Sequence, residues 1–297
     1  MSFISSNNYE FNYHKFIYKN PKIHNEGIKS QHWQLKDMLK TYENKLLFSQ
    51  HNKVFLYDTK LKQKKILANE LKFYPASLNA YKNYLVVGGA NGQLYIKNLE
   101  TKTFLISSIS NSINNHINIS EDAIYISNND RNLKIITLDL ENLLQINFPS
   151  QVNHSCVSPD NKYLVLVGDS NDVFLYGIEK LHYRLIAKLK TVNDGGFCVS
   201  WNKLSNIQQC GTPKGAVRSV FFSKKHSIDL LFFTEQYSYI NVYDTRTFEH
   251  RQINNVKDSM LTGSTILEND YKVFVSTETE IFEYDIDTVI RRIFGGI

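Results

Sequence analysis

One short pattern, an apolar strand that ends in an aromatic residue and an acid, returns about every forty residues along this chain of 297 residues. The clearest copies are Val54-Phe-Leu-Tyr57-Asp58, Ile240-Asn-Val-Tyr243-Asp244 and Ile281-Phe-Glu-Tyr284-Asp285, and weaker copies end at Asn98, Asp139 and Gly177. The steps between successive ends are 40, 41, 38, 67 and 41 residues. A period of about 40 to 45 residues with a terminal Trp-Asp-like pair is typical of a propeller blade of four antiparallel strands.

The repeat therefore predicts an all-β, WD-repeat-like β-propeller, but one step is irregular. The 67 residues from Gly177 to Asp244 are too few for two regular units. The segment Phe197-Cys-Val-Ser-Trp201-Asn202 reads as an inner strand with its turn, whereas residues 203–214 contain no Val-rich strand pair. We predict seven repeat units with the fifth incomplete, near residues 191–214. Six complete blades plus an insertion is the alternative.

The propeller is expected to span residues 31–297, with a blade at residues 215–253 and a last outer strand at residues 289–294. Residues 1–30 are expected to be flexible because their composition is polar and irregular. The alternative is that the apolar residues of this segment dock as an added strand, namely Phe11, Tyr13, Phe16, Ile17 and Tyr18.

Composition excludes several other classes of protein. The formal net charge is +5, but the basic residues are scattered rather than gathered on one stripe, as nucleic-acid binding normally requires. The densest run, Lys60 to Lys65, falls where a third strand should turn into an outer strand, so we interpret it as a solvated edge. The three cysteines lack metal-type spacing, which favours a reducing compartment. No long apolar segment is present, so we expect a cytoplasmic or nuclear protein.

The sequence contains no local catalytic motif. Its histidines are isolated, and Gly88-Gly-Ala-Asn-Gly92 leads into a strand, which indicates a hairpin and not a phosphate-binding loop. We therefore expect no enzyme, no cofactor and no metal, and we interpret His154 as a hydrogen-bonded histidine of an inner strand. A metal site or catalytic triad assembled from several blades stays open as an alternative.

A second set of motifs lies in the second half of the chain: Trp201-Asn202, Gly215-Ala216-Val217-Arg218 and Asp229-Leu230-Leu231. With the N-terminal segment His32 to Leu39, these resemble a group of fungal and plant WD-repeat proteins marked by a short domain of unknown function with an Asp-Leu-Leu motif. The resemblance is specific over residues 191–253, and it implies a propeller without known catalytic activity. Members of that group carry a full blade before the Gly-Ala-Val-Arg element, so closure of the ring stays open for this chain.

The motif residues also have structural interpretations. Leu230 and Leu231 are expected in the core, and Asp229 is expected to cap the preceding turn. Arg218, on an innermost strand, is expected either to face the central channel or to pair with an acid of the neighbouring blade.

The expected function is a non-enzymatic scaffold that binds a protein or peptide. The resemblance implies a substrate receptor of a GID-type ubiquitin ligase that reads protein N-termini, with ligase subunits as partners. Asp130, Asp194 and Glu235 are the candidates to bind an amine, and the apolar tail with Phe294 and Ile297 is the candidate anchor. The alternatives are a scaffold associated with nucleic acid or chromatin, and a propeller without a remaining specific function.

Overall fold

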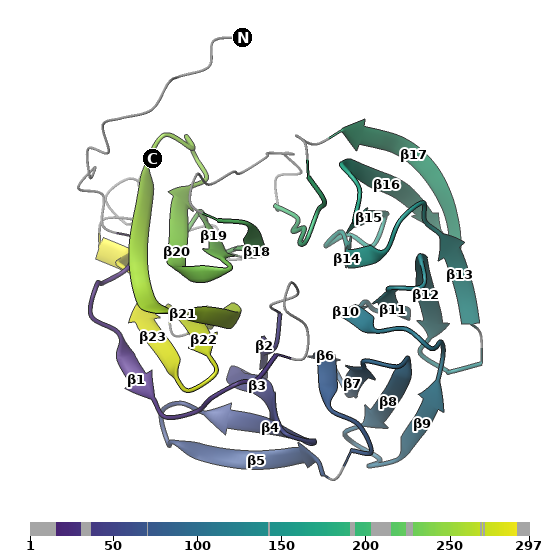
Figure 1. Cartoon of the computed structure of the whole chain (residues 1–297), viewed down its shortest axis with the longest axis horizontal. Helices are drawn as coiled ribbons and strands as arrows, with labels where there is room; N and C mark the ends of the chain where they lie inside the picture. The colour runs from purple at the N-terminus through teal and green to yellow at the C-terminus, as the bar shows by residue number, and fades with distance from the viewer. Residues whose placement is uncertain are drawn as a thin grey trace.

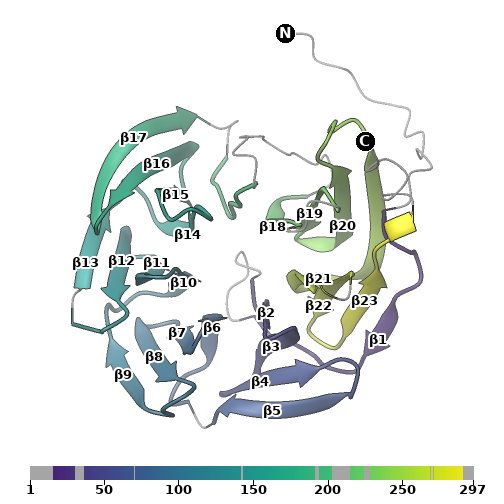
Figure 2. The ribbon, with the colours of Figure 1, turned by 180° about the vertical axis from the view of Figure 1, so that it is seen from behind.

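Antiparallel sheets arranged around a common centre make up the fold (Figures 1 and 2). The computed structural model describes residues 16–30, 37–69, 71–141, 143–190, 194–202, 215–223, 228–267, 269 and 271–289. In these ranges four sheets have four strands each and a fifth sheet has seven. None of the helical residues among them forms a helix long and apolar enough to cross a membrane.

The strands of the four-stranded sheets follow one another along the chain. The first sheet consists of β2 (Leu39–Tyr42), β3 (Lys45–Gln50), β4 (Lys53–Asp58) and β5 (Gln63–Ala68). The second consists of β6 (Pro75–Tyr81), β7 (Tyr84–Gly89), β8 (Gln93–Asn98) and β9 (Phe104–Ser108). The third consists of β10 (Asn114–Ile119), β11 (Ala123–Asn128), β12 (Asn132–Thr137) and β13 (Leu143–Asn147). The fourth consists of β14 (Val152–Val157), β15 (Tyr163–Gly168), β16 (Asp172–Glu179) and β17 (His182–Lys190).

The seven-stranded sheet combines two further units that share one strand. Its order is β1 (Lys22–His24), β23 (Ile281–Asp285), β22 (Lys272–Thr277), β21 (Arg251–Leu267), β20 (Tyr237–Asp244), β19 (Leu230–Glu235) and β18 (Val217–Phe222). The first part of β21 pairs with β20, and its last part, from Leu261 to Leu267, pairs with β22. The 17 residues of β21 are therefore the outer strand of one unit and the inner strand of the next.

The repeated pattern in the sequence corresponds to the third strand of each unit. Its copies end β4, β8, β20 and β23, and the copies at Asp139 and Gly177 lie at or near the ends of β12 and β16. The terminal acid accepts backbone hydrogen bonds, as expected: Asp58 Oδ1 binds the amides of Lys60 and Leu61, each at 3.0 Å. The prediction of an all-β propeller of WD-repeat type is confirmed.

Apolar side chains fill the space between neighbouring sheets. One buried cluster joins the first and second sheets and reaches Phe274 and Ile281 of the last unit, and other clusters lie between the second and third and between the third and fourth sheets. Tyr57 belongs to the first cluster, and its hydroxyl lies 3.0 Å from Nδ1 of His24 on β1. Tyr57, the aromatic residue of this copy of the repeat, thus packs between adjacent units.

Residues 194–202 have no regular secondary structure, yet their hydrogen bonds place them where another inner strand would begin. Asn115 Nδ2 on β10 donates to the carbonyl of Val152 at the start of β14, at 2.7 Å. Asn153 Nδ2, at the equivalent position of β14, donates to the carbonyl of Gly196 at 3.1 Å. Residues 194–202 therefore take the position of a fifth inner strand, in agreement with seven units of which the fifth is incomplete. Residues 203–214 lie outside the described part.

The segment 16–30 docks on the last unit. Phe16 and Ile17 are buried, and β1 pairs antiparallel with β23. Of the residues expected to dock as an added strand, Ile17 makes an isolated bridge to Ile286, whereas the paired strand itself is Lys22–His24. Phe11 and Tyr13 lie outside the described part with the rest of residues 1–15. β1 holds the outer position of the last unit and Val289 is helical, so the expectation of an outer strand that begins at residue 289 is corrected there. Residues 290–294 of that expected strand lie outside the described part.

Candidate functional site

A cavity of about 460 Å³ lies where the inner strands converge. It is bordered by residues of β2, β6, β10, β14, β18 and β21 and by residues 198–200 of the incomplete unit. Its lining carries charges of both signs, from Asp37, Glu43, Lys40 and Arg218. A site shared by so many units can bind a ligand only when the whole ring is folded.

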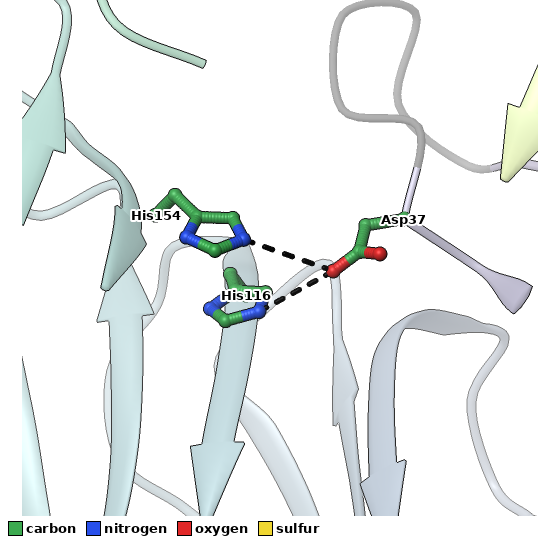
Figure 3. A group of neighbouring side chains, drawn as sticks. All are labelled: Asp37, His116 and His154. Atoms are coloured by element: carbon green, nitrogen blue, oxygen red, sulfur yellow. Dashed lines mark ion pairs between the residues drawn. The ribbon is translucent and has the colours of Figure 1, made fainter. Parts of the chain in front are cut away.

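Asp37, His116 and His154 form a cluster on one side of this cavity (Figure 3). Nε2 of His116 lies 3.3 Å from Oδ2 of Asp37, and Nε2 of His154 lies 4.0 Å from the same oxygen. The two imidazole rings are stacked, with centroids 3.6 Å apart and planes at 18°. Both Nε2 atoms thus point toward one carboxylate oxygen.

The backbone explains how three distant residues meet. His116 and His154 occupy equivalent positions on neighbouring inner strands, each following a register shift at the start of its strand. Asp37 lies two residues before β2, and the amide of Met38 between them donates to the carbonyl of Thr262 on β21 at 3.2 Å. This bond and the full burial of Leu39 fix the backbone from which the Asp37 side chain projects.

Burial and charge set the protonation states in the cluster. Burial alone would raise the pKa of Asp37, but the Lys40 ammonium and the two imidazoles outweigh it and hold the pKa well below its usual range. Burial lowers the pKa of His116, although its hydrogen bond to Asp37 acts in the opposite direction. Burial also lowers the pKa of His154, and the neighbouring His116 lowers it further. At neutral pH the cluster therefore consists of one carboxylate and two neutral imidazoles.

The expectation that His154 is a hydrogen-bonded histidine is wrong. Its Nδ1 has no hydrogen-bond partner in the described part of the chain, and its Nε2 is too far from Asp37 for a hydrogen bond. It contacts His116 by ring stacking instead.

Arg218 faces the cavity, which is the first of the two positions that the sequence left open. Its guanidinium lies 3.9 Å from the ring centroid of Phe197, and Nη2 donates to Oε1 of Gln236 at 2.8 Å. Nε and Nη1 are buried and have no partner among the described residues. Burial lowers the pKa of Arg218, yet an arginine stays charged in proteins. The cavity therefore contains an incompletely bonded cation.

Two cysteines also line the cavity, Cys156 and Cys198. Burial raises the pKa of Cys198 to about 12. The thiol is protonated at neutral pH, and the thiolate is the nucleophilic form of cysteine. Cys198 therefore lacks the activation that a catalytic cysteine needs. Cys210 lies outside the described part.

None of the three acids predicted to bind an amine is among the described residues that line the cavity. Asp130 lies in the turn after β11 and pairs with Nζ of Lys134 at 2.9 Å. Asp194 is exposed and accepts a hydrogen bond from the amide of Gly195 at 2.7 Å. Glu235 is buried and accepts a hydrogen bond from Nδ2 of Asn241 at 3.1 Å. Phe294 and Ile297 lie outside the described part.

The motif residues of the incomplete unit make structural contacts. Trp201 Nε1 donates to the carbonyl of Cys156 at 2.9 Å, and its ring packs on Tyr163 with 6.3 Å between centroids. Asn202, the next residue, is partly buried.

The motif residues around β18 and β19 shape the inner strands. A Cβ on Gly215 would lie 3.2 Å from Oε2 of Glu235, the carbonyl of Ala216 accepts a hydrogen bond from the amide of Gln236, and Val217 pairs with Glu235.

The Asp-Leu-Leu motif lies at the start of β19. Leu230 and Leu231 are core residues, as predicted. Asp229 has a φ of 45° and accepts a hydrogen bond through its carbonyl from the amide of Thr245, so its backbone shapes the turn before β19.

Sequence reasoning missed Asp37 and His116. One signal was available, because the 38 residues from His116 to His154 equal one step of the repeat, which places both histidines at the same position of successive units. Nothing comparable points to Asp37, because it precedes the first unit and reaches the cluster only through the folded ring.

Comparisons with known proteins agree with this architecture. Residues 215–254 match the model of an uncharacterised protein domain, DUF2415. An uncharacterised protein of Schizosaccharomyces pombe is 28% identical over 331 aligned positions, covering 92% of this chain and 93% of the relative. A chain in the crystal structure of the mitotic checkpoint complex superimposes with a TM-score of 0.56 at 14% identity, covering 93% of this chain and 80% of that one. That likeness shows a WD40-like propeller fold.

Proposed function

We propose that this chain is a non-enzymatic propeller scaffold that binds a protein or peptide in its central cavity. The observation that carries the proposal is the cavity itself. Residues of six inner strands border it, and its lining includes charged side chains of both signs. A peptide offers complementary groups of both signs, and polar groups placed in a concave site fix its orientation. The solved structure with a similar fold belongs to a multi-protein complex, which supports a protein partner.

The more specific form of the proposal is a substrate receptor of a GID-type ubiquitin ligase that reads a protein N-terminus. Such a receptor needs an acid to bind the N-terminal amine. Asp37 replaces the three predicted acids in this role, because its carboxylate lines the cavity and stays ionised. Its present ion pair with Lys40 shows that this carboxylate accommodates an ammonium group. An incoming N-terminal amine would replace the lysine there.

The receptor must also contact the ligase, and the apolar tail with Phe294 and Ile297 is proposed as this second contact. The tail follows the last unit in the sequence, so removing it should spare the sheets that form the cavity.

The test is affinity purification from the native cells with quantitative mass spectrometry. Four tagged proteins are compared: the full chain, a deletion of residues 295–297, Asp37→Asn and Arg218→Gln. The full chain should recover ligase subunits together with substrates. The deletion should lose the ligase, while Asp37→Asn should keep the ligase and lose the substrates at least tenfold.

Two results would contradict the proposal at different levels. Folded full-length protein that recovers no ligase subunit would refute the receptor role but leave the scaffold. Binding of all partners unchanged by both Asp37→Asn and Arg218→Gln would refute the use of the cavity.

A further inference from the structure

Hydrogen bonding accounts for only part of the stacked pair, because His116 contacts Asp37 through Nε2 while other ring nitrogens of the pair stay unpaired among the described residues. Both side chains are at least largely buried, and Nδ1 of each ring has no partner in the described part of the chain. Buried polar atoms without partners cost free energy, so they usually reflect a function or a missing ligand. Among the described residues, both Nε2 atoms face the same acceptor, Oδ2 of Asp37 (Figure 3).

The donor set of this cluster suits a transition metal. Neutral imidazole and carboxylate are common ligands of Zn²⁺, Co²⁺ and Fe²⁺, whereas Mg²⁺ and Ca²⁺ prefer oxygen ligands alone.

The distances are close to those of a metal site. One ligand atom from each of the three residues lies within 4.8 Å of the others. Bonds of about 2.0 to 2.1 Å in a tetrahedral site place ligand atoms about 3.3 Å apart. His116 already lies 3.3 Å from Asp37, and His154 at 4.0 Å would have to approach by about 0.7 Å. The lone pair of each Nε2 lies in its ring plane, so the two rings, now stacked at 18°, must also turn relative to each other before both can bind one ion. Rotation about the side-chain bonds of one imidazole would supply both changes.

We infer that Asp37, His116 and His154 bind one divalent transition-metal ion, of the class of Zn²⁺ and Co²⁺, with at least one coordination position open to the central cavity. Three protein ligands leave a fourth position for water or a ligand, which is the arrangement of an open metal site. The ion would connect the segment before β2 to β10 and β14, so it would also stabilise the ring across its centre.

Lys40 is the competitor of the metal. Its ammonium forms an ion pair with Oδ2 of Asp37, the oxygen that both histidines face. A bound dication would have to displace it. Lys40→Met removes the competing charge and keeps an unbranched side chain, so it should raise the affinity for metal.

The inference does not depend on peptide binding. A metal ion and a peptide amine would both use Asp37, and they should therefore compete. Measurement of metal binding without any peptide separates the two proposals, because failure of either leaves the other standing.

The experiment is a titration of the full chain, stripped with a chelator and dialysed, with Co²⁺ and then Zn²⁺. Visible absorption reports the coordination of Co²⁺, and isothermal titration calorimetry gives stoichiometry and affinity. We expect one equivalent of metal, visible bands typical of a nitrogen- and oxygen-ligated Co²⁺, and a rise in Tm with saturating Zn²⁺.

Variants identify the ligands. Asp37→Asn and His154→Ala should each weaken binding at least tenfold, and Lys40→Met should tighten it at least threefold. His182→Ala on the exposed face of β17 is the matched control, and Cys198→Ser tests binding by the cavity thiol. Both should bind as the wild type does.

Because a variant can fail to fold, each is first compared with the wild type by far-UV circular dichroism and by Tm without metal. The inference is overturned if folded wild-type protein takes up no Co²⁺, or if folded Asp37→Asn and His154→Ala bind it as tightly as the wild type. It is equally overturned if Cys198→Ser alone abolishes binding.

Discussion

Glu283 is the residue whose charge contributes most clearly to the stability of the ring. It is buried on β23, where Oε2 lies 2.7 Å from Nε2 of His24 and Oε1 pairs with Lys272. It therefore joins the docked strand β1 to the last unit. Removing one partner of a buried ion pair leaves the other charge uncompensated.

Glu283→Gln should lower the free energy of unfolding by about 3 kcal/mol at pH 7, because it removes the buried partner of Lys272 and leaves that lysine paired, among the described residues, only with the exposed Asp285. Chemical denaturation measures the change. Glu280→Gln is the control, because Glu280 pairs with Lys257 at the surface and such pairs contribute about 1 kcal/mol or less. Equal losses of unfolding free energy in the two variants would show that burial of Glu283 does not strengthen its contribution to stability.

The same residue predicts a pH dependence. Burial would raise the pKa of Glu283, but the His24 and Lys272 contacts outweigh it and lower the pKa from 4.5 to about 2. A lowered carboxyl pKa stabilises the fold above the unfolded value, and this stabilisation is lost as the pH falls from 4.5 toward 2. The difference in free energy of unfolding between wild type and Glu283→Gln should therefore shrink over that range. A difference independent of pH would contradict this assignment.

Among the elements of the fold, the docked segment before β1 should contribute as much to stability as a core strand does. Ile17 is fully buried, and its amide and carbonyl both bond to the Gln252 side chain on β21. Ile17→Ala should cost about 2 to 5 kcal/mol, because it opens a cavity in the core. Ile23→Ala on β1 is the matched control, since Ile23 is half exposed, and it should cost about 0.5 kcal/mol or less. Thermal unfolding distinguishes them, and similar losses would show that the segment is only loosely attached.

The sequence predicted the elements that depend on local pattern. The third strand of each unit could be predicted because the alternation of apolar and polar residues, the aromatic residue and the terminal acid all lie within a few residues of one another. The docking of residues 16–30 depended on a partner about 260 residues away, β23, and a polar segment of three strand residues carries little local signal. For the same reason residues 289–294 were assigned to an outer position that the N-terminal strand occupies.

The candidate site was predicted less well than the fold. Arg218 lines the cavity, which is one of the two positions that the sequence left open for an arginine on an innermost strand. The acids Asp130, Asp194 and Glu235 were chosen by charge alone, and the structure gives each a local partner in a turn or a strand. Asp37 lines the cavity because the ring brings the start of the chain beside β21, which no local pattern encodes.

At the level of the whole molecule, residues 194–202 are joined to the fourth sheet by hydrogen bonds of Gly196 with Asn153 and Gly168. Asn153→Ala removes the bond to the Gly196 carbonyl, and the amide of Gly196, which donates to Gly168, should then exchange its hydrogen about fivefold to tenfold faster. Hydrogen exchange followed by NMR measures it. Asn115→Ala removes the equivalent bond to Val152, between two complete sheets, and should leave the exchange of the Gly196 amide unchanged. Unchanged exchange in Asn153→Ala would mean that this side chain does not attach the segment.

The shared strand β21 bears on how such a protein can change in evolution. Most neighbouring units are joined by a loop, and surface loops tolerate insertions at little cost in stability. Between the units of β20 and β22 the chain passes without a loop, because one 17-residue strand serves both. An inserted residue there would shift the register of one unit and turn its buried side chains outward. Lineages of this fold should therefore differ in length at their other joints and keep this one constant.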